Sequence, residues 1–264
     1  MVWRKRRFRE REEGVNTRLI LDIPYFCGNM QKAVGLTLSH MEDRQPFAVF
    51  TPGATVAARA AKDGAFGKVL QSGDLILPDG SGCLFAARLC GTRLEERIAG
   101  IDFAEALFGE AEKYSARVFL YGGRAGVAER AASHLRKKYK HLIFAAAHGY
   151  GEDPYERIAA FCPHIVCVCL GAGKQEAWIT DHKEAVGGIL IGLGGSLDVW
   201  AGDVRRAPAL LRHVGLEWAY RTLREPRRLP RLFPLPRYFW KCLWTRRSSK
   251  CQKQKRKDVG SVKM

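Results

Sequence analysis

The segment 77–82, which reads Leu-Pro-Asp-Gly-Ser-Gly, sets one carboxylate between small residues at an expected strand-to-loop corner. Apolar residues precede Asp79, so we expect this acid at the end of a buried strand, facing a cleft. Arg97 and Asp102 follow it in the stretch Glu-Arg-Ile-Ala-Gly-Ile-Asp. A carboxylate held there can act as a general base, and an arginine nearby can stabilise a developing negative charge. An aspartate before glycine also commonly hydrogen-bonds its own turn, and these residues alone leave both interpretations open.

Three glycine-bearing loops form a second group of candidate residues, at 122–126, 171–176 and 192–196. Each follows an expected strand, and the loops at 122–126 and 171–176 precede expected helices, so backbone amides there can hold a phosphate. The loop at 192–196 offers another close approach of the backbone to an anion, or an ordinary N-cap by Ser196. The alternative is that the glycines serve tight packing between strand and helix. Gln175 can also contact a sugar or phosphate oxygen, and Asp198 can accept a hydrogen bond from a hydroxyl.

The first of these loops argues against a nicotinamide-dinucleotide enzyme. It reads Gly-Gly-x-x-Gly instead of Gly-x-Gly-x-x-Gly, and no Asp or Glu occurs between Glu129 and Glu152. Such enzymes use an acid about twenty residues beyond the loop to bind the ribose. The sequence lacks that acid.

The elements that must position these residues alternate between short apolar strands and amphipathic helices. This pattern predicts an α/β fold, with a parallel-sheet, Rossmann-like core and helices on both faces. In such sheets ligands bind beyond the carboxyl ends of the strands, where the three loops fall. The expected strands are Thr17–Leu21, Phe47–Thr51, Val118–Tyr121, Leu142–Ala146, Ile165–Leu170 and Ile189–Leu193, and the expected helices lie in Gly35–Met41, Ala54–Gly64, Asp102–Tyr114, Val127–Tyr139, Pro154–Phe161 and Gln175–Ala185.

Charge divides the 264-residue chain into a nearly neutral body and basic ends. The formal net charge is +17, and residues 205–258 contain 17 Lys and Arg against three acids. We expect a charged leader at 1–16, an α/β core at 17–209 and a basic, aromatic appendage at 210–244. The polar, basic residues 245–264 are expected to be disordered.

Composition limits the location of the protein. The N-terminus is charged and has no apolar segment typical of a signal peptide, and the uncharged stretches are too short or too glycine-rich to span a bilayer. The eight cysteines lack the spacing of a disulfide framework or a metal site, which favours a reducing cytoplasm. No Asp-x-Asp pair is present, so we expect no metal and no cofactor.

The appendage allows three interpretations. Leu210–Leu223 is a basic helical stretch, and the four prolines from Pro226 to Pro236 exclude one long straight helix after it. Aromatic residues then interleave with Lys and Arg, which suits an anionic membrane surface. Nucleic-acid binding and a solvated tail with a few packed aromatics are the alternatives. The neutral body favours the membrane, and we expect no nucleic-acid partner.

Seven motifs stand in order between residues 77 and 228. They are Leu-Pro-Asp-Gly, Glu-Arg-Ile-Ala-Gly-Ile-Asp, Leu-Tyr-Gly-Gly-Arg-Ala-Gly-Val-Ala-Glu, Leu-Gly-Ala-Gly-Lys-Gln-Glu-Ala-Trp-Ile, Gly-Gly-Ser-Leu-Asp-Val-Trp-Ala-Gly, Arg-Arg-Ala-Pro, and Gly-Leu-Glu-Trp-Ala-Tyr-Arg with a following Glu-Pro-Arg-Arg. Together they closely resemble the WecG/TagA/CpsF glycosyltransferases, a family of N-acetylmannosaminyltransferases of bacterial surface-polymer synthesis. The resemblance covers about residues 45–235.

The resemblance implies an inverting transfer from a UDP-sugar to a sugar on an undecaprenyl-diphosphate lipid, at the inner face of the plasma membrane. It implies that Asp79 is the base, that Arg97 and Gln175 share its pocket, and that appendage arginines reach the active site. With Asp79 and Arg97 as catalytic residues, the predicted substrate-binding residues are Thr51, Gly122, Gly123, Gln175, Gly194, Gly195, Asp198, Arg206, Arg221 and Arg228.

One position departs from the family pattern. Members typically have Thr-x-Asn where this chain has Thr51-Pro52-Gly53, so Gly53 supplies no amide side chain. The leading activity implied is transfer of N-acetylmannosamine to lipid-linked N-acetylglucosamine, for surface polysaccharide or teichoic acid. Transfer of N-acetylmannosaminuronic acid or glucose, and nucleotide-sugar binding without turnover, stay open as alternatives.

Overall fold

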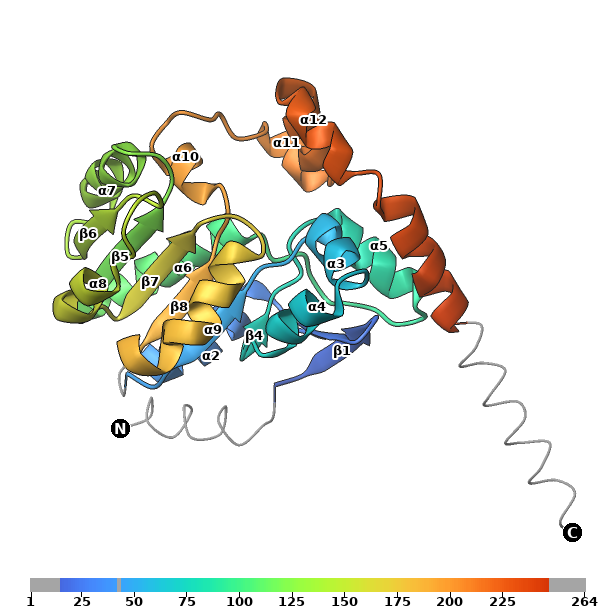
Figure 1. Ribbon diagram of the computed structural model, residues 1–264, viewed down its shortest axis with the longest axis horizontal. Coiled ribbons are helices and arrows are strands. Elements are labelled where there is room, and N and C mark those ends of the chain that lie inside the picture. The colour runs from blue at the N-terminus through green and yellow to red at the C-terminus, as the bar shows by residue number, and fades with distance from the viewer. Residues whose placement is uncertain (1–14, 42–43, 247–264) are drawn as a thin grey trace, which may run out of the picture.

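A six-stranded sheet forms the centre of the computed structural model, which describes residues 15–41 and 44–246 (Figure 1). Its strand order is β4-β3-β8-β7-β5-β6, and every neighbouring pair is parallel. The parallel α/β core predicted from the sequence is therefore confirmed. The strands are β3 (Phe47–Phe50), β4 (Leu75–Ile76), β5 (Arg117–Gly122), β6 (Ile143–Ala147), β7 (Ile165–Cys169) and β8 (Ile189–Gly192).

Helices cover both faces of this sheet, as predicted. Successive side chains of a strand point to opposite faces, so Val118 and Leu120 of β5 join one apolar cluster while Phe119 and Tyr121 join the other. The first cluster includes residues of α2 (Met30–Met41), α6 (Gly100–Ala111), α7 (Val127–Lys138) and α10 (Ser196–Trp200). The second includes residues of α3 (Ala54–Ala60), α4 (Gly64–Gln71), α5 (Ser81–Leu89), α8 (Tyr155–Phe161) and α9 (Lys174–Val186).

Two predicted elements differ in detail. The expected first strand forms as β1 (Thr17–Ile20), but it pairs antiparallel with β2 (Ile23–Phe26) in a separate two-stranded sheet. The prediction of a single helix over Ala54–Gly64 was wrong, because α3 ends at Ala60 and Asp63 caps the start of a second helix, α4. The Asp63 side chain accepts a hydrogen bond from the Phe66 N–H at 3.1 Å and so caps α4.

The appendage folds into four short helical segments, which Figure 1 shows in orange and red beside α5. They are α11 (Ala209–His213), α12 (Glu217–Arg224), the 3-10 helix η2 (Pro226–Arg231) and a last helix at 235–246. The expected basic helix 210–223 is interrupted at Gly215, whose φ of +77° ends α11. In the last helix Tyr238 and Cys242 are buried against the core, and Phe239 meets Phe85 of α5 edge to face.

Within the described ranges, no helix has the length and apolar character needed to cross a membrane. The predicted leader at 1–16 and tail at 245–264 fall almost entirely outside the residues that the structure describes.

Candidate active site

Asp79 lies just beyond the carboxyl end of the edge strand β4. Pairing with β3 continues to Leu77, whose N–H donates to the Phe50 carbonyl at 2.8 Å, and Gly80 then turns the chain into α5 with a φ of +93°. The Asp79 carboxylate accepts a hydrogen bond from the backbone N–H of Gly100, the first residue of α6. The side chain therefore bonds to a distant helix start, where the helix dipole favours a negative charge.

The surroundings of Asp79 set its protonation near neutral pH. Partial burial raises the pKa of this carboxyl from 3.8 to about 6, because a desolvated carboxylate loses hydration. Arg221, Arg97 and the Gly100 N–H oppose that rise, whereas the charge of Glu217 adds to it. At pH 7 most of the population is ionised, and its pKa is close enough to the working pH for general-base catalysis.

Glu217 joins the two arginines nearest the acid. The Arg221 Nη2 lies 2.7 Å from one Glu217 oxygen, and the Arg97 Nη1 lies 3.5 Å from the other. Glu217 and Arg221 belong to α12 of the appendage, so this distant segment contributes charges that act on Asp79. Glu217 was not among the predicted site residues, although it stands in the Gly-Leu-Glu-Trp motif of the appendage.

A second acid–arginine pair fastens the start of the appendage to α6. Arg206 donates through Nη1 and Nη2 to the two oxygens of Asp102, at 2.5 and 2.6 Å. Burial acts to raise the pKa of Asp102, but the bonds and charge of Arg206 outweigh it and lower that pKa. The Nε groups of Arg206 and Arg221 are buried and, among the described residues, lack hydrogen-bond partners. Such buried donors are costly unless a ligand supplies an acceptor.

The loops after β3 and β8 run to helices on opposite faces of the sheet, which is the arrangement of a ligand-binding switch point. Thr51, which follows β3, donates through its hydroxyl to the Gly192 carbonyl at 2.7 Å. A Cβ added to Gly100 would lie 2.8 Å from the Thr51 Oγ1, so a glycine is needed for this approach. Thr51 therefore lies beside the residue that holds Asp79.

Gln175 is only 4% exposed and organises the loop after β8. Its Oε1 accepts a hydrogen bond from the Gly194 N–H at 2.8 Å, and its amide donates to Glu176 at 2.9 Å. The Oε1 of Gln175, a residue predicted to contact substrate, is therefore already hydrogen-bonded to the protein backbone. This arrangement positions the Gly194 backbone.

Glycine loops after β5 and β7 pack tightly against each other. A Cβ at Gly122 would come within 2.3 Å of the Cys169 carbonyl oxygen, and φ at Gly122 is +133°. Gly123 has a φ of +69°, and its carbonyl accepts a hydrogen bond from the Gly149 N–H at 2.9 Å. For Gly122 the packing alternative raised in the sequence analysis accounts for the glycine.

Three further predicted residues lie near the same edge or in the appendage. Gly195 precedes α10, and Asp198 lies in the first turn of that helix. A Cβ built on Gly195 would lie 3.6 Å from the Asp198 Oδ2. Arg228 lies in η2, and its side chain is outside what the structure describes.

Gly53, the position that departs from the family pattern, adjoins the acid itself. It precedes α3, and a Cβ built on it would lie 3.0 Å from the backbone oxygen of Asp79. A larger residue here would press directly on the Asp79 loop.

The described residues contain no group of three or more His, Cys, Asp or Glu that could hold a metal ion. The site offers instead one titrating carboxylate, several guanidinium groups and helix-start amides. Such a set can accept a proton from a hydroxyl and stabilise a phosphate that gains negative charge.

Comparisons with known proteins match nearly the whole described chain. The family model described as glycosyl transferase WecG/TagA/CpsF family matches residues 18–252. An N-acetylglucosaminyldiphosphoundecaprenol N-acetyl-beta-D-mannosaminyltransferase of Bacillus subtilis is 36% identical over 230 residues, which is 85% of this chain and 90% of that protein. Proteins of the same description from Bacillus spizizenii and Staphylococcus aureus are 32% and 31% identical, over 81% and 76% of this chain and 85% and 82% of their own lengths.

Proposed function

The chain belongs to the WecG/TagA/CpsF glycosyltransferase family, and we propose that it transfers N-acetylmannosamine from a UDP-sugar to N-acetylglucosamine on an undecaprenyl-diphosphate lipid. Relatives carrying this description cover most of the chain, and the family model spans residues 18–252, which include Glu217 and Arg221 of the appendage. The observation that carries the mechanism is the carboxylate of Asp79. Burial raises its pKa to about 6, while the neighbouring Arg221 and Arg97 favour its ionised form.

In this mechanism Asp79 takes the proton of the acceptor hydroxyl as that oxygen attacks the anomeric carbon. The bond from the anomeric carbon to the diphosphate breaks on the opposite side, and the leaving UDP gains negative charge. Arg97, Arg221 and the unpaired Nε of Arg206 are suited to hold that charge, because guanidinium–phosphate hydrogen bonds are strong. No step requires a divalent cation.

The glycine-loop backbone and Thr51 are proposed to line the donor side of the site. Gln175 acts in this scheme as a positioning residue, since it holds the Gly194 N–H. Asp198 is proposed to accept from a donor hydroxyl and Arg228 to join the phosphate contacts. The basic appendage supports both substrates at a membrane surface.

Transfer of another UDP-sugar, such as an N-acetylmannosaminuronic acid or glucose donor, is the second candidate. The observation that favours it is Gly53, which lies against the Asp79 backbone and supplies no amide side chain where the family pattern has one. A site without that amide group can differ in the donor sugar that it selects.

Release of UDP from a panel of UDP-sugars, with a short-chain lipid-diphosphate N-acetylglucosamine acceptor, tests both candidates. We expect acceptor-dependent release that is fastest with UDP-N-acetylmannosamine. Faster turnover of another donor selects the second candidate. No release with any donor, or release that does not depend on acceptor, would contradict the proposed transfer.

We also propose that the appendage docks on the anionic inner surface of the plasma membrane. Nine large hydrophobic residues of 210–246 are exposed, among them Trp218, Phe233, Trp240 and Trp244, and they lie among arginines. Aromatic and basic side chains together favour a bilayer interface. Co-sedimentation with anionic but not neutral vesicles is expected. Binding to DNA without binding to vesicles would contradict this assignment.

A further inference from the structure

A hollow of about 450 Å³ lies between α5 and the segment joining α11 to α12. One part of its wall is cationic and comes from Arg88, Arg97 and Arg212. The other part is apolar and comes from Leu84, Phe85 and Val214. The hydroxyl of Ser81 at the start of α5 donates to the Gly215 carbonyl at 2.8 Å and ties the two sides together. This hollow is called the α5 groove below.

The arginine side chains of the α5 groove make few direct contacts with acids, although Asp102 lies near enough to Arg212 and Arg97 for their charges to interact. In the described part of the chain, the Arg88 side chain makes no ion pair or hydrogen bond, and the Arg212 side chain donates through Nε to the Ala207 carbonyl, at 3.1 Å. Arg97 has one loose contact with Glu217, at 3.5 Å. A groove lined by three guanidinium groups with so few direct ion pairs suits a multiply charged anion such as a diphosphate.

The apolar wall continues onto the appendage. Phe85 is 50% exposed and Val214 is 59% exposed, although both are large hydrophobic residues. The Phe85 ring meets the Phe239 ring edge to face, with centroids 5.0 Å apart, and the exposed Trp240 follows on the same helix. An apolar path therefore leads from the groove toward the surface proposed to meet the membrane.

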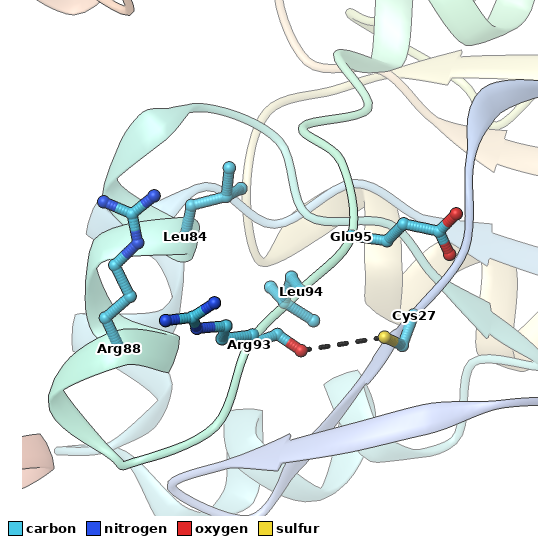
Figure 2. A pocket seen from close by; sticks show the side chains of 6 residues that line it. All are labelled: Cys27, Leu84, Arg88, Arg93, Leu94 and Glu95. Atoms are coloured by element: carbon cyan, nitrogen blue, oxygen red, sulfur yellow. Dashed lines mark hydrogen bonds between the residues drawn. The ribbon is translucent and has the colours of Figure 1, made fainter.

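A second hollow, of about 750 Å³, extends the α5 groove on its far side. It shares Leu84 and Arg88 with the groove and adds Cys27, Arg93, Leu94 and the acid Glu95. Figure 2 shows Leu84 and Arg88 on α5 and Arg93 and Leu94 on the loop that follows it, around the same hollow. The combination of guanidinium and leucine side chains is thus repeated along the helix.

The α5 groove and the glycine loops follow different strands of the sheet. Helix α5 begins two residues after Asp79, at the edge strand β4, whereas the glycine loops follow the more central strands β5, β7 and β8. In an inverting displacement the attacking and leaving groups approach from opposite sides. An acceptor in the α5 groove and a donor on the glycine loops would satisfy that requirement.

We propose that the α5 groove binds the lipid-linked acceptor of the proposed transfer. Arg88 and Arg212 hold its diphosphate, Leu84, Phe85 and Val214 contact its first prenyl units, and the sugar extends toward Asp79. The assignment rests on the proposed function for the identity of the acceptor. In this assignment Arg88 and Arg212 bind the prenyl diphosphate, whereas Arg97, at the end of the groove toward Glu217, and Arg221 bind the UDP diphosphate.

Calorimetric titration with farnesyl diphosphate, without donor, tests the groove independently of turnover. Arg88→Ala should weaken binding of both farnesyl diphosphate and inorganic pyrophosphate about tenfold, since it removes a charged contact. Phe85→Ser should weaken farnesyl diphosphate alone. Arg157→Ala, an exposed arginine on α8, is the matched control and should bind like wild type. Equal binding by all variants, or none by wild type, would overturn the proposal.

Steady-state kinetics separate the acceptor site from the donor site. Both groove variants should raise KM for the lipid acceptor while leaving KM for the UDP-sugar unchanged. A raised donor KM with an unchanged acceptor KM would give the groove to UDP and end the proposal. If wild type turns over no UDP-sugar but the groove variants still lose farnesyl diphosphate, the proposed transfer fails and the prenyl diphosphate groove stands.

Discussion

Replacing Asp79 with asparagine should lower activity and raise stability. Burial raises the pKa of Asp79 to about 6 in the folded protein, against 3.8 for an unperturbed aspartate. The folded state therefore binds this proton more tightly than the unfolded state does. Above pH 6 both states are ionised, so the folded state bears the cost of a desolvated carboxylate. Below pH 3.8 both states are protonated, and the cost disappears.

The size of the effect follows from the two pKa values. One pKa unit corresponds to about 1.4 kcal/mol, so ionised Asp79 lowers the free energy of unfolding by up to about 3 kcal/mol at pH 7.5. At pH 5 the folded carboxyl is mostly protonated, and the penalty is about half as large. Asparagine does not titrate and should remove the penalty. Activity should nevertheless fall about 10²–10⁴-fold, the usual contribution of a general base.

Urea unfolding at pH 7.5 and pH 5, with UDP-release rates on the same samples, measures both effects. UDP-sugar binding should largely survive, because the variant keeps the arginines. The control is Asp181→Asn, an exposed site on α9, where stability should change by no more than about 0.5 kcal/mol. Wild-type turnover in Asp79→Asn would remove this residue from the role of base. A stability gain that is the same at both pH values would refute the electrostatic reasoning.

Four further predictions concern the same site. Wild-type kcat/KM should fall tenfold per pH unit below about pH 6 as Asp79 is protonated. Glu217→Gln should move this acidic limb of the pH profile to lower pH, because the Glu217 charge raises the pKa of Asp79, and a shift to higher pH would contradict that effect. Arg221→Met should move the limb to higher pH and raise KM for the UDP-sugar, and a variant with both values unchanged would exclude Arg221 from the site. Gly122→Ala should cost more than about 3 kcal/mol or prevent folding, because its Cβ would meet the Cys169 carbonyl at 2.3 Å; a melting temperature equal to that of wild type would show that the backbone can yield. Transfer should persist in EDTA, and a loss restored by Mg²⁺ would show that a metal takes part.

The local sequence pattern was sufficient to predict most strands and helices of the core, but it missed elements at the edge of the fold. The strands Val118–Tyr121 and Ile165–Leu170 were predicted within a residue or two of β5 and β7, because buried parallel strands are continuous apolar runs. Strand β2 and helix α5 were not predicted. The β2 sequence contains Pro24, and α5 begins with Ser81 and Gly82, so helix and strand propensities give neither element a clear signal. Packing against the core decides both.

The sequence by itself identified the side chains that are proposed to carry the chemistry. The Leu-Pro-Asp-Gly motif marked Asp79, the motif around Arg97 supplied a cation, and the charge distribution marked the appendage. Residue type, turn chemistry and charge are properties of short segments, so they can be read without coordinates.

Only the tertiary structure decided how those groups act on one another. Arg97 meets Glu217 across 120 positions of sequence, and Arg206 meets Asp102 across 104. The pKa of Asp79 depends on its burial and on charges from both the core and the appendage. Desolvation and Coulomb interactions depend on distance in space, which the folded packing of α5, α6 and α12 alone establishes.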